Sequence, residues 1–415
     1  MLTDEQIVEK RKIQKQYFTP TSPASENYIS RGPEYDMATF SDFETVGRQI
    51  IVYGESSVGK TSLIKHNLRK LKLEQGVNFI EVRIRNTTTL NTFLTQVLKK
   101  LGFRQGVTEQ ETRGTTTQGK LKGDTKLPIL NAGATLSGEM SNTTTTQFDY
   151  ISNVDFDDVI DIMIDTNTIL FVDDMEKLED NELRITLADL AKNLSDAVSD
   201  SNSLAKLVFA GATTDVESLL NADISLQYRL VTREIPFLTD DEVVGILDHG
   251  WSAMDLKFSM SQVEKATYQA GYAGSTVHSI GKRTTDNTLS RKDEIINNSD
   301  IDSAVQQELD GREFMLRRSF DAAKNDRETK SKMRNKVLLA IAEMKEVSHI
   351  RRSEIERAVT SMFGSEFTQA GLSNSLSQLQ LGKYGEVIKS DGHGDWQFVN
   401  PMMQVYIRRH KDELL

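Results

Sequence analysis

The sequence contains no cysteine and no long apolar run. Because none of its 415 residues is cysteine, disulfide bonds, thiolate zinc sites and cysteine nucleophiles are excluded. No stretch approaches the roughly 18 consecutive apolar residues that a membrane-spanning helix requires. The N-terminus also lacks the basic-then-apolar pattern of a signal peptide. We therefore expect a cytoplasmic chain that has no membrane partner.

What is present is the composition of a soluble globular protein. Hydrophobic residues make up 38% of the chain and charged residues 27%. At roughly 150 residues per domain, the length predicts two or three domains. The net charge is −11, yet from Lys330 onward 13 Lys and Arg stand against 10 Asp and Glu. Only this mildly basic C-terminal part is suited to hold nucleic acid, and a solvated surface explains the same excess.

A phosphate-binding loop is predicted after the apolar strand 49–53. Its glycines let successive backbone N–H groups face a bound phosphate, and the helix that follows adds its positive end. Lys60 is expected to reach the β and γ phosphates, and Thr61 to bind magnesium. The pattern predicts ATP and Mg²⁺ as cofactors; the alternative is a chance match in a Gly/Ser-rich turn. The predicted nucleotide contacts are Gly54, Glu55, Ser56, Ser57, Val58, Gly59, Lys60, Thr61 and Ser62.

A second anchor for magnesium is predicted at the end of the apolar strand 168–172. Asp173 follows this strand directly and is the expected metal ligand. The neighbouring Asp174, or less favourably Glu176, is expected to polarise the attacking water. The structural alternative is that one of these acids caps the following helix.

Two further residues are candidates for contacts with the γ phosphate. Thr213 follows the strand 205–211 and is predicted to sense that phosphate, unless it caps the helix that begins near Asp215. Arg229 is a candidate arginine finger toward a neighbouring subunit, because a permanent, fork-shaped cation suits that role. The alternative for Arg229 is an ordinary surface arginine.

The order of predicted elements gives an α/β fold with four parts. Strands and helices alternate as far as the strand predicted at 233–237, which implies a mostly parallel sheet flanked by helices. A run of helices follows to about residue 325, and then three helices and a hairpin, which are typical of a winged helix. The predicted boundaries are 1–44 for an N-terminal helix and arm, 45–237 for a P-loop core, 238–325 for a helical lid and 326–415 for the winged helix.

One segment of the predicted core has no clear structure. Residues 104–150 contain 11 Thr and 6 Gly in 47 positions, with almost no helical periodicity. The segment is either a functional insertion, whose short alternating pieces can pair as a hairpin, or a disordered loop.

With these motifs in this order, the chain resembles the AAA+ ATPases. It is most similar to the branch that holds origin-recognition initiators and the signal-transducing STAND ATPases. The arm 17–20, the segment 172–178, the segment 235–242 and the C-terminal helices all resemble that branch. The resemblance implies an ATPase that self-associates.

Two departures from that family pattern concern hydrolysis. Many AAA+ motors have glutamate directly after the metal-binding aspartate, whereas this chain has Asp174, so we expect slow hydrolysis. The lid segment 270–278 has no arginine where initiators carry a second sensor. Lys282 and Arg283 lie one helical turn beyond His278 and are substitutes, while His278 itself is expected to be a packed lid residue.

Two functions remain open, and a third is disfavoured. The first is a nucleotide-driven switch that forms homo-oligomers through Arg229 and signals to a partner or effector protein, as in bacterial regulation or antiviral defence. The alternative is a DNA-binding initiator or transposition-type loader that uses residues 326–415; against it, the helix 369–381 has no Arg or Lys. A metabolic kinase or GTPase is disfavoured, because no guanine-selecting Asn-Lys-x-Asp segment is present.

Overall fold

The computed structural model describes seven stretches of the chain. These are residues 1–102, 156–222, 224–325, 332–345, 349–364, 368–390 and 394–415. The predicted insertion 104–150 therefore lies outside the described residues. Within the described part, no helix is both long enough and apolar enough to cross a membrane.

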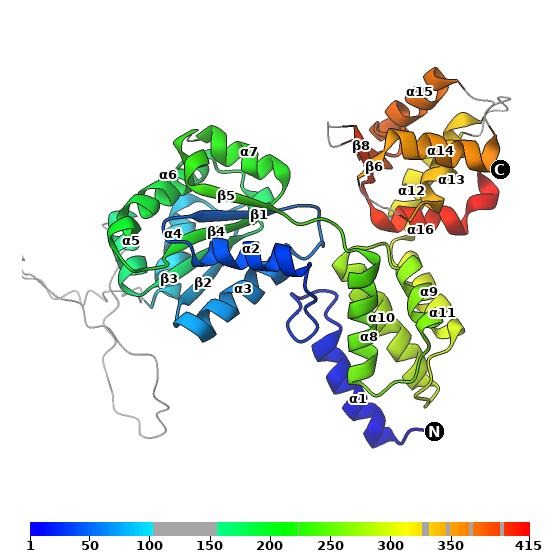
Figure 1. Ribbon diagram of the computed structural model, residues 1–415, viewed down its shortest axis with the longest axis horizontal. Coiled ribbons are helices and arrows are strands. Elements are labelled where there is room, and N and C mark those ends of the chain that lie inside the picture. Colours follow the sequence, from blue (N-terminus) through cyan, green and yellow to red (C-terminus); the bar gives the residue numbers. More distant parts are fainter. Residues whose placement is uncertain (103–155, 223, 326–331, 346–348, 365–367, 391–393) are drawn as a thin grey trace, which may run out of the picture.

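A five-stranded parallel sheet forms the core, in the order β2-β3-β4-β1-β5 (Figure 1). Its strands are β1 (Gln49–Tyr53), β2 (Asn78–Arg83), β3 (Thr168–Asp173), β4 (Lys206–Gly211) and β5 (Leu230–Glu234). The predicted position of β5, 233–237, was three residues too late, because the strand pairs with β1 from Leu230 opposite Gln49 onward. Since all strands are parallel, their carboxyl ends meet at one edge, where ligands bind in such sheets.

Helices cover both faces of the sheet, as the alternation predicted. One face is covered by α2 (Pro33–Glu44) and α3 (Lys60–Gln75). The helices on the other face are α4 (Leu90–Lys100), α5 (Phe156–Asp165), α6 (Asn181–Ala197) and α7 (Thr213–Ala222). Neighbouring β1 residues face opposite ways: Ile50 packs with Leu63 of α3, and Ile51 packs with Leu187 of α6. Strands β3 and β4 are buried along their whole length, as expected for the centre of a covered parallel sheet.

Helix α2 was missed by the sequence analysis, which assigned an extended arm up to residue 44. It begins with proline at its first turn and buries Phe43 in the core. The buried ammonium group of Lys206 in β4 donates hydrogen bonds to the carbonyls of Phe43 and Thr45 at the end of α2, both at 2.7 Å. Burial lowers the pKa of Lys206 to about 7. The helix is therefore fixed by tertiary contacts that local sequence patterns do not reveal.

A helical layer follows the sheet and also receives the N-terminal helix. Its members are α8 (Asp240–Ala253), α9 (Met260–Tyr268), α10 (Gly274–Ser290) and α11 (Asn298–Asp310). The predicted capping box of Thr239 and Glu242 is present at the start of α8. Helix α1 (Asp4–Tyr17) packs against α8 and α10, and Gln14 donates a hydrogen bond to the carbonyl of Lys282 at 2.8 Å. Helix α1 thus lies beside helices from much later in the chain (Figure 1).

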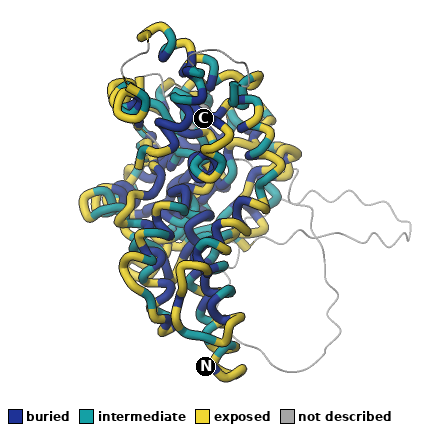
Figure 2. Tube along the Cα trace, turned by 90° about the vertical axis from the view of Figure 1, so that its right-hand side faces the viewer, coloured by how far each residue is buried: buried dark blue, intermediate teal, exposed yellow. Residues whose placement is uncertain are grey.

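The C-terminal part combines helices with a small antiparallel sheet in the order β6-β8-β7. Its helices are α12 (Glu313–Ala323), α13 (Met333–Glu343), α14 (Arg352–Phe363), α15 (Gln369–Leu379) and α16 (Pro401–Arg409). Its strands are β6 (Ile350–Arg351), β7 (Ile388–Ser390) and β8 (Asp395–Phe398). The predicted hairpin is present as β7 and β8, whereas β6 and α16 were missed; a two-residue strand gives no readable alternation. Buried residues run continuously through this part and the helical layer (Figure 2).

Candidate functional site

The loop between β1 and α3 adopts backbone angles that glycine allows and most other residues do not. Gly54 has φ +147°, and a Cβ there would lie 2.4 Å from the carbonyl oxygen of Ile235. Gly59, with φ +110°, precedes the first residue of α3, and Ser57 also has a positive φ. The first N–H groups of α3 lack helical partners, so the loop forms a cradle for an anion.

Lys60 turns back over this loop. Its ammonium group donates hydrogen bonds to the carbonyls of Gly54 and Glu55, both at 2.9 Å. Burial lowers the pKa of Lys60, while the carboxylates of Glu176, Glu55 and Asp173 oppose that shift. The cation is thus held at the mouth of the cradle, next to the position that a phosphate group would take.

Thr61 and Asp173 meet across the sheet edge, although 112 residues separate them. The Thr61 hydroxyl lies 3.2 Å from both carboxylate oxygens of Asp173. Burial and the neighbouring charge of Asp174 raise the pKa of Asp173. A buried carboxylate beside a hydroxyl fits Mg²⁺, which typically takes one or two protein oxygens and completes its shell with phosphate and water. Among the described residues, no group of three or more His, Asp or Glu side chains is placed to hold a metal by itself.

The two acids after Asp173 also line the same space. Asp174 has a positive φ of 62° and pairs with Lys177 at 3.0 Å. Asp174 does not cap the following short 3-10 helix with its side chain, so the capping alternative does not apply to it. Arg83, at the end of β2, lies 3.9 Å from Asp173 and was not singled out from the sequence.

Thr213 is the first residue of α7, directly after the edge that carries the loop. Its side chain lies outside the described part of the structure, so its predicted contact remains a prediction. The residue that secures this turn is Asp215, whose carboxylate accepts a hydrogen bond from the backbone N–H of Ala212. Burial raises the pKa of Asp215, and the charge of Glu176 adds to that rise.

Arg229 lies at the opposite edge of the sheet, just before β5 and after a short 3-10 helix, η3 (Ile224–Tyr228). Its guanidinium pairs with Asp196 at 2.7 Å. Because the loop follows β1 and Arg229 precedes the parallel strand β5, the two lie at opposite ends of the strands. Arg229 is therefore not part of the site in its own chain, and its predicted role remains a prediction.

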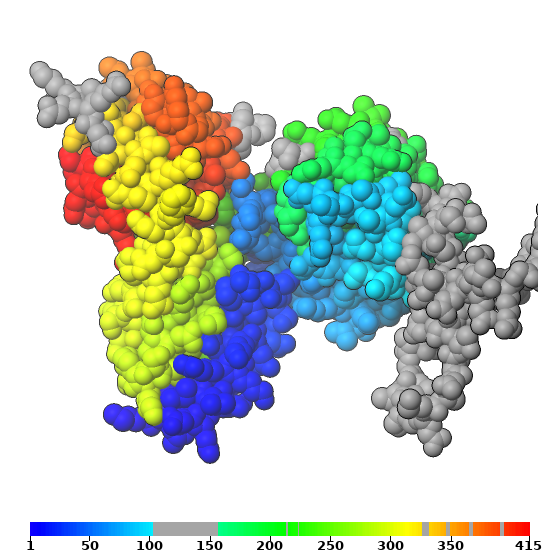
Figure 3. All heavy atoms as spheres, turned by 180° about the vertical axis from the view of Figure 1, so that it is seen from behind, coloured from blue at the N-terminus to red at the C-terminus, as the bar shows by residue number. Residues whose placement is uncertain are grey.

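A cavity of about 420 Å³ joins the loop to the N-terminal arm and to α10. Ser56 through Ser62 line one end together with Asp173, Asp174, Glu176 and Arg83. The other end is lined by the arm between residues 19 and 31 and by Gly274, Ser275 and His278. Figure 3 shows the N-terminal segment lying between the helical layer and the sheet domain. The volume suits a small molecule such as a nucleotide.

Side chains of the arm fasten it on both sides of the cavity. Arg31 is buried, pairs with Glu242 of α8 at 2.6 Å and donates to the carbonyls of Val58 at 2.8 Å and Pro236 at 2.9 Å. On the loop side, the backbone N–H of Ala24 donates to the hydroxyl of Ser62 at 3.0 Å. The arm is thus an integral wall of the site.

Phe18 anchors the start of this arm in the helical layer. Its buried ring fits against Gly250 and Gly281, where an added Cβ would lie 2.2 Å and 2.3 Å from the ring. The next residue, Thr19, donates its backbone N–H to Nδ1 of His278 at 3.3 Å. Burial lowers the pKa of His278 to about 4, so the imidazole is neutral and can accept this bond. His278 therefore has a packing role and also lines the cavity.

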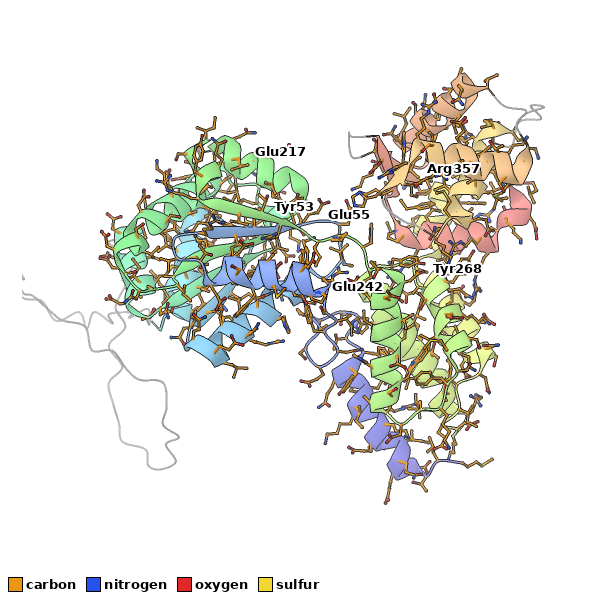
Figure 4. The ribbon with its side chains drawn as sticks, in the orientation of Figure 1. Tyr53, Glu55, Glu217, Glu242, Tyr268 and Arg357 are labelled. Atoms are coloured by element: carbon orange, nitrogen blue, oxygen red, sulfur yellow. The ribbon has the colours of Figure 1, made fainter. Side chains whose placement is uncertain are left out.

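Some residues that were predicted to contact the nucleotide or its phosphates lie away from the cavity. Gly54 and Glu55 do not line it. The Glu55 carboxylate points to the C-terminal part instead, where it contacts Lys389 of β7 and Gln397 of β8 (Figure 4). The suggested substitutes for the second sensor also lie elsewhere: Lys282 pairs with Asp286 and Arg283 with Glu308.

The parallel sheet, its flanking helices and the loop define an α/β P-loop fold. Residues 38–204 match the family model described as the AAA ATPase domain. The matched segment includes the loop, β2 and β3, so the P-loop and Asp173 lie within the part of the chain that is similar to the AAA ATPase domain. No curated protein matches the chain.

Several solved structures are similar in fold to this chain over most of their length. The Walker-type ATPase PABY2304 of Pyrococcus abyssi is 15% identical with a TM-score of 0.46, over 94% of this chain and 99% of that one. The ORC1 protein of Aeropyrum pernix, solved in complex with DNA, is 14% identical with a TM-score of 0.48, over 97% and 95%. The RuvB branch migration motor of Thermotoga maritima is 14% identical with a TM-score of 0.40, over 88% and 91%. Likeness at this level transfers no role.

Proposed function

We propose that the chain is an ATP-driven switch that self-associates and signals to a partner protein through its C-terminal part. The observation that carries this proposal is the contact between the phosphate-binding loop and the C-terminal sheet. Lys389 and Gln397 are directly paired across β7 and β8, and both reach the carboxylate of Glu55. The proposed nucleotide site and the distant C-terminal part therefore share one residue.

In this proposal, the loop amides and Lys60 hold the triphosphate, and Thr61 and Asp173 hold Mg²⁺. The bound metal ion would neutralise phosphate charge. Asp174 or Glu176 orients the attacking water, and Thr213 senses the γ phosphate. Because Asp174 is already paired with Lys177 at 3.0 Å, we propose that hydrolysis is slow.

Self-association is proposed to complete the site. Arg229 lies at the far edge of the sheet, so it meets the phosphates of a second copy rather than those of its own chain. To do so, it leaves Asp196, which is an exposed carboxylate whose pairing contributes little stability. Nearby, Ile224 and Tyr228 are exposed by 77% and 83%, which gives this edge apolar area for a contact between copies.

The signal is proposed to pass from the loop to the C-terminal part by two routes. The first is Glu55, whose carbonyl holds Lys60 and whose carboxylate holds Lys389. When Lys60 moves toward a phosphate, the Glu55 carbonyl loses a hydrogen bond. The backbone of Glu55 can then shift, and this shift alters the contact between the Glu55 carboxylate and Lys389. This change differs between nucleotide states, as a switch requires.

The second route passes through the helical layer. Arg408 of α16 lies over the ring of Tyr268 in α9 at 3.9 Å, and donates to the carbonyls of Tyr268 and Met344 at 2.8 Å and 2.7 Å. Burial lowers the pKa of Arg408, yet its hydrogen bonds and the aromatic face stabilise the cation. The C-terminal part is thus fastened to the layer that carries Gly274 and Ser275 at the cavity.

A distance measurement between the two parts tests this proposal. The absence of native cysteine allows site-specific labels at Glu217→Cys on α7 and Arg357→Cys on α14, two exposed positions (Figure 4). We expect energy transfer between the labels to differ among ATP, ADP and nucleotide-free samples. Lys389→Glu should abolish that difference, and the charge swap Glu55→Lys with Lys389→Glu should restore it.

Lys383→Glu is the matched control, because it changes the same charge in the C-terminal part away from Glu55. Light scattering on the same samples reports the mass of the assembly. Energy transfer and mass that are both unchanged by nucleotide would contradict the switch.

The alternative is a DNA-binding initiator or loader that uses the C-terminal part as a winged helix. Helices α13, α14 and α15 and the antiparallel sheet support this reading, and Arg351 of β6 and Arg357 of α14 are exposed. Against it, Arg352 is turned toward Gln369 and Ser373 of α15, and Lys389 is turned toward Glu55. Tight, steeply salt-dependent binding of duplex DNA by the full chain, lost in Arg351→Glu with Arg357→Glu, would favour this alternative.

A further inference from the structure

A groove separate from the cavity at the phosphate-binding loop lies between α2 and α3, which are neighbours on one face of the sheet (Figure 1). Its volume is about 280 Å³. Sites for drug-sized ligands begin at roughly 300 Å³, so the groove suits a smaller molecule. It is lined by residues of both helices, among them Asp36, Met37, Phe40 and Glu44 of α2 and His66 and Lys70 of α3.

The cation of this groove is Lys70. Its ammonium group lies over the ring of Phe40, 3.6 Å from the ring centroid. An ammonium group has three hydrogen-bond donors, and a contact with the face of a ring uses its charge without filling all three. Lys70 can therefore donate to an anionic group of a ligand while it stays on the ring.

The anions of the groove are Asp36 and Glu44. Asp36 accepts a hydrogen bond from the backbone N–H of Arg31 at 3.2 Å, and Glu44 accepts one from the side-chain amide of Gln75 at 2.5 Å. Both donors are neutral, so neither bond compensates the negative charge. Lys70 forms no ion pair with either carboxylate, although the structure describes all three residues. Opposite charges that line one groove and stay apart leave room for a ligand that pairs with each of them.

The spacing along α2 sets the shape of that ligand. Asp36, Phe40 and Glu44 follow one another at intervals of four residues, which places them on one face of the helix. Eight residues separate the two acids, or about 12 Å between their Cα atoms. The ring of Phe40 and the side chain of Met37 come between them in the chain. The ligand thus needs two cations joined by an apolar stem, and a carboxylate for Lys70; a basic amino acid has all of these.

Two residues of the groove contact residues that line the cavity at the phosphate-binding loop. The ring of His66 stacks on that of Tyr28, with centroids 4.1 Å apart and planes at 15°, and Tyr28 lines that cavity. Asp36 holds the backbone of Arg31, whose side chain donates to the carbonyl of Val58 in the loop. A ligand that shifts His66 or Asp36 therefore acts on the wall of that cavity.

We propose that the groove between α2 and α3 binds a free basic amino acid, and that this ligand changes the affinity of the chain for ATP. The two cations of the amino acid pair with Asp36 and Glu44, and its carboxylate pairs with Lys70. The binding itself does not depend on nucleotide, whereas its effect on ATP rests on the proposed function. Because such coupling is reciprocal, ATP changes the affinity for the amino acid by the same factor.

The test uses L-lysine and two analogues that each lack one of its charges. Cadaverine lacks the carboxylate, and L-norleucine lacks the side-chain ammonium group. Binding of each to the full chain is measured by calorimetry without nucleotide, at physiological salt so that general charge attraction is screened. We expect L-lysine to bind at least about tenfold more tightly than either analogue, since each analogue forgoes one charged hydrogen bond.

Two variants assign the charges to residues. Glu44→Gln should weaken the binding of L-lysine about tenfold, and Lys70→Gln should bring the affinities for L-lysine and cadaverine within about twofold of each other. Glu34→Gln and Lys72→Gln are the matched controls, because these exposed residues lie on the same two helices but do not line the groove. Both controls should bind L-lysine as the unaltered chain does.

The effect on nucleotide is measured as the affinity for ATP with and without saturating L-lysine. We expect a change of at least about fivefold. His66→Leu should abolish this change, because the stacking on Tyr28 is lost, while L-lysine still binds.

The outcomes distinguish the claims. If L-lysine binds no more tightly than its analogues, or equally well to the Glu44→Gln chain, the amino-acid site is overturned. If L-lysine binds but the affinity for ATP stays the same, the coupling is overturned. A chain that binds L-lysine selectively and does not bind ATP would support the site and contradict the proposed function.

Discussion

The two ends of the cavity are built in different ways. The phosphate end is one short loop and one strand end, in which backbone shape and Lys60 make the site. The other end, here called the arm end, is assembled from the arm, α8 and α10, and side chains such as Arg31 and His278 join segments more than 200 residues apart. The phosphate end is thus a local structure on the sheet, whereas the arm end exists only when the helical layer is folded onto the arm.

This difference separates binding from stability. A change at Lys60 should weaken nucleotide binding and leave the fold intact, because its ammonium group bonds to carbonyls of its own loop. Changes in the arm or its partners should lower the free energy of unfolding, because they remove contacts between distant segments. Four predictions, from the largest expected effect to the smallest, test whether the two ends differ in this way.

Gly54→Ala should have the largest effect on nucleotide binding. The added Cβ would lie 2.4 Å from the Ile235 carbonyl oxygen at a φ of +147°, so the loop must shift, at a cost of about 4 kcal/mol. We expect no detectable ATP binding and an unchanged circular dichroism spectrum. Gly76→Ala is the control, since Gly76 has open space around it. Normal ATP binding by Gly54→Ala would contradict the described loop.

Arg31→Met should lower the free energy of unfolding by about 3 kcal/mol, because it leaves the partly buried carboxylate of Glu242 and two carbonyl oxygens without their partner. Urea denaturation measures this loss. Arg83→Met is the comparison at the phosphate end, where the arginine side chain is 55% exposed, and it should cost less than about 1 kcal/mol. Equal losses in both variants would remove the distinction between the two ends.

Lys60→Ala should weaken ATP binding by about 100-fold, or roughly 3 kcal/mol, since a charged hydrogen bond to phosphate is lost. The melting temperature should change little, because the ammonium group bonds only to carbonyls of its own loop. Titration with a fluorescent ATP analogue measures the affinity. Lys65→Ala, on the same helix but paired with Glu81, should bind ATP normally.

His278 should make the stability of the arm end depend on pH. Its pKa is about 4 in the folded chain and 6.5 ordinarily, so the unfolded chain binds the proton first as the pH falls. Stability is therefore complete above pH 6.5 and is lost toward pH 4, by about 2 kcal/mol at pH 5. His278→Asn keeps an acceptor for the Thr19 N–H but cannot titrate. Urea denaturation at pH 7 and pH 5 should show a smaller loss in this variant, and equal losses would exclude His278 as the cause.

Much of the sheet could be predicted from the sequence, because its strands are apolar runs separated by turn residues. The errors in the predicted helices and strands lie where tertiary contacts determine the secondary structure. The start of β5 depends on its register with β1, and α2 depends on Phe43 and on the buried Lys206 that holds its end. The two-residue strand β6 exists only because Ile350 pairs with Trp396 of β8.

The same division applies to the site. The loop was readable because its backbone shape requires glycines at fixed spacing, and Asp173 was readable as an acid at the end of a buried strand. Arg31 carries no such signal, because its partner, Glu242, lies more than 200 residues away. The contact of Glu55 with Lys389 was equally unreadable, since nothing in the loop pattern specifies a partner outside the sheet.

By itself, the sequence determined the anion-binding loop, the acid that meets Thr61 and the alternation of strands and helices, because each depends on neighbours along the chain. Only the tertiary structure decided which end of the cavity the arm closes, that Arg229 faces away from its own loop, and that the C-terminal sheet contacts Glu55. The physical reason is that a hydrogen bond or an ion pair acts over a few ångströms in space, and the folded chain alone determines which distant residues come that close.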